Sequence, residues 1–285
     1  MYIVMLIIIM LIVISENAFG IDWVNFNVTR HANTTFTAAT FDNAMNVVNM
    51  RMQLNNHHCT DDVPCTARFR RNGALGIFGT TGDGLDVITN QNELSQVFGI
   101  TTHRIKVVTS IDYCAGSYNP SIIGCGRCND FGFILENWVQ DTYVHEYGHN
   151  VMGCGHRNDC AWNIMNALSN GQNDSVNSSE CSGFGGKAYP KLCGDIYDGN
   201  GGPLTLNGGP YWVTCTVTVP AGQNLTIQAG VEIQFNFDNK ITSNGFLNAD
   251  GSTTRILLYS NRTGFPSLKI DKNLQLKNGG QVSVH

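Results

Sequence analysis

The segment HEYGHNVMGCGH, at residues 145–156, is the feature that most constrains how this chain can fold. His145 and His149 are four residues apart, a spacing that puts both side chains on one face of an α-helix. Two imidazoles placed in this way can bind one metal ion at about 2.0–2.1 Å. The adjacent Glu146 can take a proton from a water molecule that the metal acidifies. The segment therefore predicts a helix that carries a zinc site and a general base.

The residues around this segment predict how the helix is held and how it ends. The periodicity predicts a helix over 133–152, with an apolar face formed by Val144, Tyr147 and Val151. Gly153 is expected to end the helix, because glycine adopts backbone conformations that other residues resist.

This pattern resembles the HExxHxxGxxH motif of the metzincin zinc proteases, followed by the segment NIMNA around Met165. The resemblance covers roughly residues 25–190 and is specific over about 145–166. It implies an α+β catalytic domain with a mixed twisted sheet and an active-site helix. It also implies three zinc ligands, a general base and a methionine turn beneath the metal; these are His145, His149 and His156, Glu146, and Met165.

The spacing departs from the family pattern at the third ligand. The family has five residues between its second and third histidines, whereas this chain has six, Asn150–Gly155. Moving a helix end by one residue rotates the exit of the chain by about 100°. Gly153 and Gly155 are expected to give the loop the freedom to bring His156 back to the metal. One alternative is that no catalytic metal binds. In another, a different residue completes the ligand set; the candidates are Asp159, His57, His58 and His103.

Several features predict an exported protein. Residues 1–20 contain an apolar run with small residues at Ala18 and Gly20, which predicts a signal peptide; the alternative is a membrane anchor. No later segment is apolar enough to cross a bilayer. The ten cysteines are expected to form disulfides, with Cys59–Cys65 and Cys154–Cys160 as local pairings. The chain contains six N-glycosylation sequons, which are used only if the host glycosylates: Asn27, Asn33, Asn173, Asn177, Asn224 and Asn261.

Charge and composition limit the classes of partner that the protein is expected to bind. The formal net charge is −5 and only 14% of residues are charged, without a run of Lys or Arg. A nucleic-acid partner is therefore not expected. Two Asp- and Gly-rich stretches, 81–86 and 194–202, have oxygen ligands suited to calcium but not the spacing of an EF-hand loop, so turns are the better interpretation. The Cys125-Gly-Arg-Cys128 segment is expected to be structural.

The coarse pattern along the chain predicts two domains. Helical spacing covers 38–54, two strands joined by a turn at Asn72-Gly73 cover 66–79, and a buried strand lies within 103–113. The expected boundaries are 1–20 for the signal peptide, 21–193 for the zinc protease domain and 194–285 for an all-β segment. That last segment resembles the first coils of a right-handed parallel β-helix, on the stretch VTVPAGQNLTIQAGVEIQF. The segment has room for only a few coils, so one interpretation is that this sequence contains only part of a solenoid. The alternative is an ordinary β-sandwich.

Two functions follow from these observations. The first is a secreted zinc-dependent endopeptidase that acts on a protein or peptide substrate, with Glu146 as general base. The second is a surface or matrix protein in which the β-solenoid serves as a spacer or contacts glycans and surfaces, and the metal site is structural or inactive. A weaker third interpretation is a zinc hydrolase that cleaves a bond other than a peptide bond.

Overall fold

A computed structural model describes residues 21–283 except 55–57, 137–140, 168–172, 174, 206–208, 237–238, 251–255, 261–265, 271–272 and 278–279. The expected signal peptide, the ligand candidate His57 and the sequon Asn261 lie outside the described residues. The chain divides into two compact units. The first unit is Trp23–Val63 with Ala67–Gly186. The described residues of the second unit lie within Lys187–His285, together with residues 21–22 and the short segment Pro64–Thr66.

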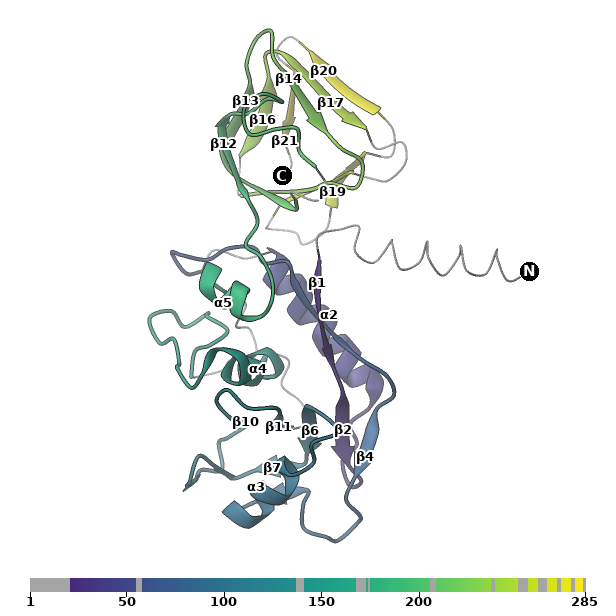
Figure 1. The fold of residues 1–285 in the computed structure, drawn as a ribbon, viewed down its shortest axis with the longest axis vertical. Helices are drawn as coiled ribbons and strands as arrows, with labels where there is room; N and C mark the ends of the chain where they lie inside the picture. Colours follow the sequence, from purple (N-terminus) through teal and green to yellow (C-terminus); the bar gives the residue numbers. More distant parts are fainter. Residues whose placement is uncertain are drawn as a thin grey trace, which may run out of the picture. The chain divides into compact units, whose positions relative to one another are not determined.

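A five-stranded sheet is the framework of the first unit (Figure 1). In spatial order its strands are β10 (Gly124–Gly126), β11 (Phe133–Glu136), β6 (Ile105–Val108), β2 (Val28–His31) and β4 (Gly76–Phe78). β11, β6, β2 and β4 pair in parallel, and β10 joins as an antiparallel edge strand. Every residue of β6 is buried, which confirms the buried strand predicted within 103–113.

Smaller sheets complete the strands of this unit. β1 (Asp22–Phe26) pairs with β3 (Ala67–Arg71), and the two-residue strands pair as β5 (Val87–Ile88) with β7 (Ser110–Ile111) and β8 (Tyr113–Cys114) with β9 (Ser117–Tyr118). The two strands predicted within 66–79 are present as β3 and β4, and Gly73 between them has a φ of +74°. They belong to different sheets, so the turn separates two layers.

The helices are α2 (Ala38–Leu54), α3 (Gln91–Phe98), α4 (Thr142–Met152) and α5 (Ser178–Gly183). α2 confirms the helix predicted for 38–54. The start of the helix predicted over 133–152 is wrong, because Phe133–Glu136 is the strand β11. Phe133, Ile134 and Leu135 are all buried, and a strand buried on both faces has a continuous apolar run that periodicity alone does not distinguish from a helix.

An aromatic cluster anchors α4 in the first unit. Tyr147 of α4 packs edge-on against Phe26, with ring centroids 5.1 Å apart, and also contacts Phe69 and Phe184. Val144 on the same side of the helix is completely buried. The opposite face of α4 is thereby left for the polar residues of the site.

A buried lysine interrupts the apolar sheet. Lys106 of β6 is completely buried, and its neighbours in register are Thr29 and Ile134. Its Nζ has no hydrogen-bond partner among the described residues. Burial lowers the pKa of this ammonium group to about 8, and the charge of Asp130 partly opposes the shift. An unpaired buried charge destabilises a fold.

We expect Lys106→Met to raise the free energy of unfolding at pH 7 by about 1–3 kcal/mol. The folded-state pKa lies below the ordinary value of 10.5. The unsubstituted chain therefore gains stability as the pH rises from about 8 towards 10.5, and the advantage of methionine shrinks over that range. Urea unfolding at pH 7 and pH 9.5 measures both effects. A variant that is less stable at pH 7, or a difference that is constant with pH, contradicts this explanation.

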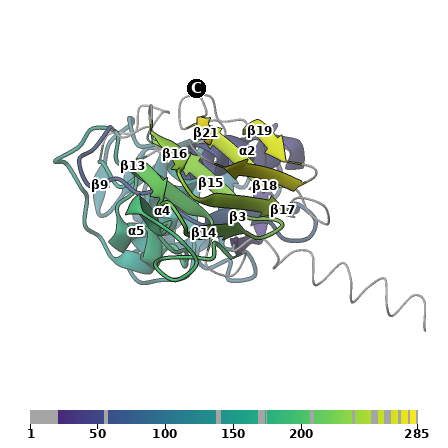
Figure 2. The same ribbon diagram turned by 90° about the horizontal axis from the view of Figure 1, so that it is seen from above.

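The described part of the second unit contains ten strands. They are β12 (Lys191–Asp195), β13 (Tyr211–Val219), β14 (Asn224–Ile227), β15 (Glu232–Phe235), β16 (Lys240–Ser243), β17 (Phe246–Asp250), β18 (Ile256–Ser260), β19 (Pro266–Ile270), β20 (Asn273–Lys277) and β21 (Gly280–Ser283). Figure 2 shows β13, β15 and β18 side by side. These three pair in parallel, as do β12 with β13, β13 with β16 and β14 with β17.

The parallel pairs recur at similar separations along the chain. Tyr211 of β13 faces Ile233 of β15, and Glu232 of β15 in turn faces Leu257 of β18. Gly222 and Gly230 have φ values of +78° and +81° and form the turns between β13, β14 and β15, as the PAG and AG segments predict. Apolar side chains from both sheets of the unit share one buried cluster. The last three strands, β19, β20 and β21, pair antiparallel instead.

All ten cysteines are disulfide-bonded, which is typical of proteins from oxidising compartments. Four of the bonds are Cys59–Cys160, Cys114–Cys125, Cys128–Cys154 and Cys193–Cys215. The local pairings Cys59–Cys65 and Cys154–Cys160 are therefore wrong. The two cysteines of the CxxC segment are structural, as expected, but each has a different partner. Among the described residues, none of the helices has the length and apolar character that spanning a bilayer requires.

The sequons differ in their surroundings. Asn27 and Asn224 are exposed. Asn173 is buried and donates its Nδ2 to the carbonyl oxygen of Asn163 at 2.9 Å, and Asn177 is the N-cap of α5. A glycan on Asn173 is therefore incompatible with the folded first unit.

Candidate metal site

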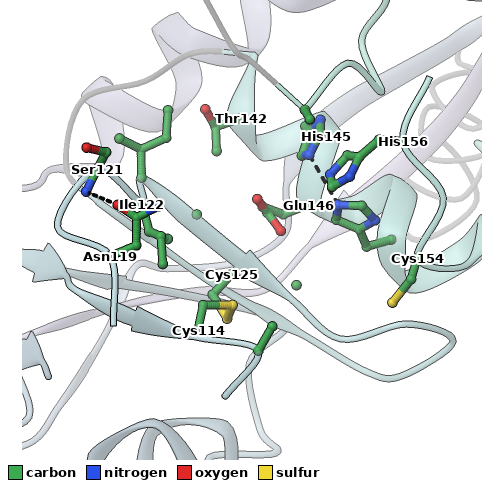
Figure 3. A pocket seen from close by; sticks show the side chains of 16 residues that line it. Cys114, Asn119, Ser121, Ile122, Cys125, Thr142, His145, Glu146, Cys154 and His156 are labelled. Carbon is green, nitrogen blue, oxygen red and sulfur yellow. Dashed lines mark hydrogen bonds between the residues drawn. A yellow bond between two sulfur atoms is a disulfide. The ribbon is translucent and has the colours of Figure 1, made fainter. Parts of the chain in front are cut away.

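The helix α4 brings the first two predicted ligands together. His145 and His149 are both buried and line a pocket. Figure 3 shows the side chain of His145 in this pocket. The Nε2 atoms of the two histidines are 3.1 Å apart. Two nitrogens bound to one tetrahedral zinc ion at about 2.0–2.1 Å lie about 3.3 Å from each other. The pair therefore has the spacing that a shared metal ion requires.

Backbone carbonyl groups orient these two imidazoles. Nδ1 of His145 donates to the carbonyl oxygen of Ile164 at 2.8 Å, and Nδ1 of His149 lies 3.3 Å from that of Gly153. A proton on Nδ1 leaves Nε2 as the free lone pair, which is the tautomer that binds metal. Burial lowers the pKa of His145 to about 4 and also lowers the pKa of His149. Both rings are therefore neutral at pH 7, as ligands must be.

His156 completes the group. Its ring centroid is 4.8 Å from that of His149 and 5.3 Å from that of His145. One nitrogen from each of the three histidines lies within 4.8 Å of the others, with His156 exposed at the mouth of the site. These three residues form a group that can hold one metal ion, and three imidazoles are a donor set that suits zinc.

The additional residue before His156 is accommodated at the end of α4. The helix continues to Met152, and Gly153 has φ +95° and ψ −178°, a region that essentially only glycine occupies. Gly155 was expected to share this role, but its φ is not positive and no atom crowds the position of a Cβ. A single glycine therefore makes the turn.

We expect Gly153→Ala to lower the free energy of unfolding by about 1–3 kcal/mol, because alanine is strained at this φ and ψ. Gly155→Ala is the matched control and should stay within about 0.5 kcal/mol. Urea unfolding of both variants measures the difference. Equal losses at the two positions would show that the turn does not depend on Gly153.

Two disulfides bracket the loop that carries His156. Cys154 is bonded to Cys128, in the segment between β10 and β11, and Cys160 is bonded to Cys59. Cys154 is therefore a structural half-cystine. The loop between the two bonds is thereby restricted at both ends.

Met165 lies against the centre of α4. Its side chain is buried, and its sulfur lies where a side chain on Gly148 would start. Gly148 stands between His145 and His149 on α4, so the absence of a side chain there lets the methionine turn approach the helix. The sequence does not reveal this contact between Met165 and Gly148.

Glu146 faces the same pocket from beside the histidines (Figure 3). A methyl group on Gly126 would lie 2.7 Å from its Oε2, and one on Gly124 would lie 2.5 Å from its Oε1. Two glycines on β10 therefore make room for this carboxyl group. Burial raises the pKa of Glu146 to about 8, and a backbone hydrogen bond from Gly126 opposes the shift. A cation beside the carboxyl group would favour its ionised form.

The pocket has a volume of about 580 Å³. Apart from Glu146 and the three histidines, its lining consists of uncharged side chains and backbone from the segments 114–126, 142, 154 and 167. The strand β10, which is the last strand of the described five-stranded sheet, forms one wall of the pocket, and the backbone N–H of its Gly126 is bonded to Glu146.

Other candidate ligands from the sequence have different partners. Asp159 is paired with Arg157 at 2.8 Å, His58 stacks on Trp162, and His103 lies beside Gly76 of β4. The calcium interpretation also finds no support in 81–86. Asp83 there accepts backbone N–H groups of Thr80 and Leu85 and contacts His31, which is a turn arrangement.

Two buried asparagines near the site were missed in the sequence. Asn150 donates to the carbonyl oxygens of Arg127 and Gly132 and accepts from the N–H of Gly132, which fixes the β10–β11 loop to α4. Asn163 is completely buried and accepts the N–H of Met165. The sequence around these asparagines does not indicate their roles. Gly124 and Gly126 of β10 are recognisable, because two glycines two residues apart in a strand indicate that another group closely approaches one face of the strand.

Comparison of the chain with protein-family models, with curated proteins and with solved structures finds no match.

Proposed function

We propose that the chain is a secreted zinc-dependent endopeptidase. The observation that carries this proposal is the convergence of His145, His149 and His156 in one pocket with the carboxyl group of Glu146. Three imidazole ligands leave one position of a tetrahedral zinc ion for water or substrate, the arrangement of catalytic rather than structural zinc sites. Zinc is proposed as the metal because three imidazoles are a donor set that suits it. Membership of the metzincin family is proposed from the motif HEYGHNVMGCGH.

Each residue of the site has a chemical task in this proposal. A zinc ion bound there supplies a Lewis acid that polarises a carbonyl group and acidifies water. Glu146 takes the proton of the attacking water and passes it to the leaving amine. The carbonyl oxygens of Ile164 and Gly153 keep the two helix histidines in the ligand tautomer. Gly124 and Gly126 keep the carboxyl group of Glu146 beside the reacting atoms.

A peptide is the substrate class that the pocket supports best. β10 is an edge strand that lines the pocket, and an extended peptide can pair with such an edge through its backbone. The lining beyond the histidines and Glu146 is uncharged, which favours uncharged side chains next to the cleaved bond. Export is proposed from the apolar segment at residues 1–20 and agrees with the disulfide bonding of all ten cysteines.

The second unit gives a second candidate function. Parallel strands whose partners recur at similar separations along the chain support a β-solenoid, a surface suited to glycan contact or to spacing. In that alternative the histidine site is structural or inactive. The two candidates differ in whether the first unit cleaves peptides.

Cleavage of a broad library of unstructured peptides by the purified chain tests the proposal. We expect cleavage that a zinc chelator stops and that added Zn²⁺ restores. Folded, zinc-loaded protein that cleaves none of the peptides contradicts the endopeptidase and favours the β-solenoid candidate.

A further inference from the structure

The loop after His156 is connected to the methionine turn by a closed ring of polar contacts. The N–H of Arg157 donates to the carbonyl oxygen of Met165 at 2.8 Å, and the N–H of Met165 donates to Oδ1 of Asn163 at 2.8 Å. Nδ2 of Asn163 donates to Oε2 of Glu180 at 2.8 Å, and that oxygen lies 3.9 Å from Nη1 of Arg157. The ring thus passes through Arg157, Met165, Asn163 and Glu180.

The guanidinium group of Arg157 also connects the loop to an earlier part of the chain. Its Nη2 donates to Asp61 at 2.6 Å, and its Nε and Nη2 bind Asp159 at 2.8 and 3.0 Å. The side chain is only 18% exposed. Hydrogen bonds between ionised groups are about twice as strong as neutral ones and fix direction when they are bidentate. The disulfide bond Cys59–Cys160 keeps the segment that contains Asp61 close to the loop that contains Arg157.

The turn at residues 164–165 contacts the supports of all three histidines. The carbonyl oxygen of Ile164 orients His145, the side chain of Met165 packs on Gly148 between His145 and His149, and the carbonyl oxygen of Met165 binds the residue next to His156. His156 is the exposed member of the group, so packing restrains it least. Its position therefore depends on the anchoring of its own loop.

We propose that Arg157 is the positioning residue that holds His156 at the metal site. The inference rests on the proposed metal site and adds a residue that the HExxH pattern does not contain. Arg157 contacts neither the metal-binding nitrogens nor the catalytic carboxyl group. It acts through the backbone of the loop, which it ties to Asp61, Asp159 and Glu180.

The test compares Arg157→Met with Arg71→Met in the full chain. Arg71 is 19% exposed and forms an equivalent ion pair with Asp42 at 2.9 Å, away from the pocket lining. Competition with a chromophoric chelator measures the dissociation constant for Zn²⁺. We expect Arg157→Met to weaken zinc binding about 10- to 100-fold, the usual cost of losing a group that orients a ligand. Arg71→Met should change it less than about twofold, and Arg157→Lys should be intermediate, because lysine keeps the charge but not the bidentate geometry.

The same substitution in a His156→Ala background separates positioning from general damage. Once His156 is absent, Arg157→Met should weaken zinc binding less than about twofold. If the unsubstituted chain binds zinc in a His156-dependent way and Arg157→Met and Arg157→Lys both bind it equally well, the inference is overturned and the metal site stands. If the unsubstituted chain does not bind zinc, the proposed function fails first. An equal loss in both backgrounds shows general damage and also overturns the inference.

Discussion

Glu146→Gln is expected to abolish peptide cleavage while zinc stays bound. Glutamine has nearly the shape of glutamate, so it fits the space that Gly124 and Gly126 leave, but it cannot accept a proton from water. General acid–base catalysis contributes about 10²- to 10⁴-fold to a rate. We therefore expect kcat to fall by at least about 10²-fold at pH 7, with the dissociation constant for Zn²⁺ changed only a few-fold.

The control for this variant is a substitution that leaves the carboxyl group of Glu146 in place. Gly155→Ala lies in the neighbouring loop, where nothing crowds the position of a Cβ, and it should retain cleavage within about twofold. Zinc content of each variant, measured by metal analysis after dialysis, accompanies the rates. Residual cleavage by Glu146→Gln at the unsubstituted rate would remove Glu146 from the mechanism.

His156→Ala is expected to have the largest effect on metal binding. The substitution removes one of three imidazoles whose nitrogens lie within 4.8 Å, and a direct ligand should cost more than the roughly 10- to 100-fold loss that is typical of groups that orient a ligand. We expect the dissociation constant for Zn²⁺ to rise more than about 100-fold and chelator-sensitive cleavage to disappear. The fold should persist, because His156 is exposed and contributes little burial.

His103→Ala is the control for His156→Ala. His103 was one of the alternative third ligands, and in the structure it lies beside Gly76 of β4, so its loss should leave zinc affinity unchanged. Circular dichroism of both variants should match that of the unsubstituted chain. Unchanged zinc affinity in His156→Ala would return the question of the third ligand to the other candidates.

Local spacing predicted α2 and the helix that carries His145, Glu146 and His149 well, because the positions of these three residues on one helix depend only on the helical period. The predicted N-terminal limit of α4 is wrong, because the structure of that segment depends on a contact with a distant part of the chain. The segment Phe133–Glu136 is a strand because it pairs in register with β6, an earlier and separate part of the chain. Such pairing leaves no trace in the spacing of the segment itself.

Long-range contacts also explain what the sequence did not reveal about the site. Cys160 pairs with Cys59 at a sequence separation of 101, and Arg157 binds Asp61 across a similar separation. Composition does not identify Cys59 as the partner of Cys160 or Asp61 as the partner of Arg157. The role of Gly153 as the end of α4 was predictable, because the helix must end before His156. The sequence does not distinguish Gly155 from Gly153, and the difference is that only Gly153 has a positive φ.

The central claim is that His156, despite the additional residue before it, binds the same metal ion as His145 and His149. X-ray absorption spectroscopy at the zinc edge of the purified chain tests this claim most directly. We predict one zinc ion per chain with three imidazole nitrogens at about 2.0–2.1 Å, reduced to two in His156→Ala. A zinc ion with only two imidazole ligands in the unsubstituted chain, or a spectrum that His156→Ala does not change, would contradict the claim.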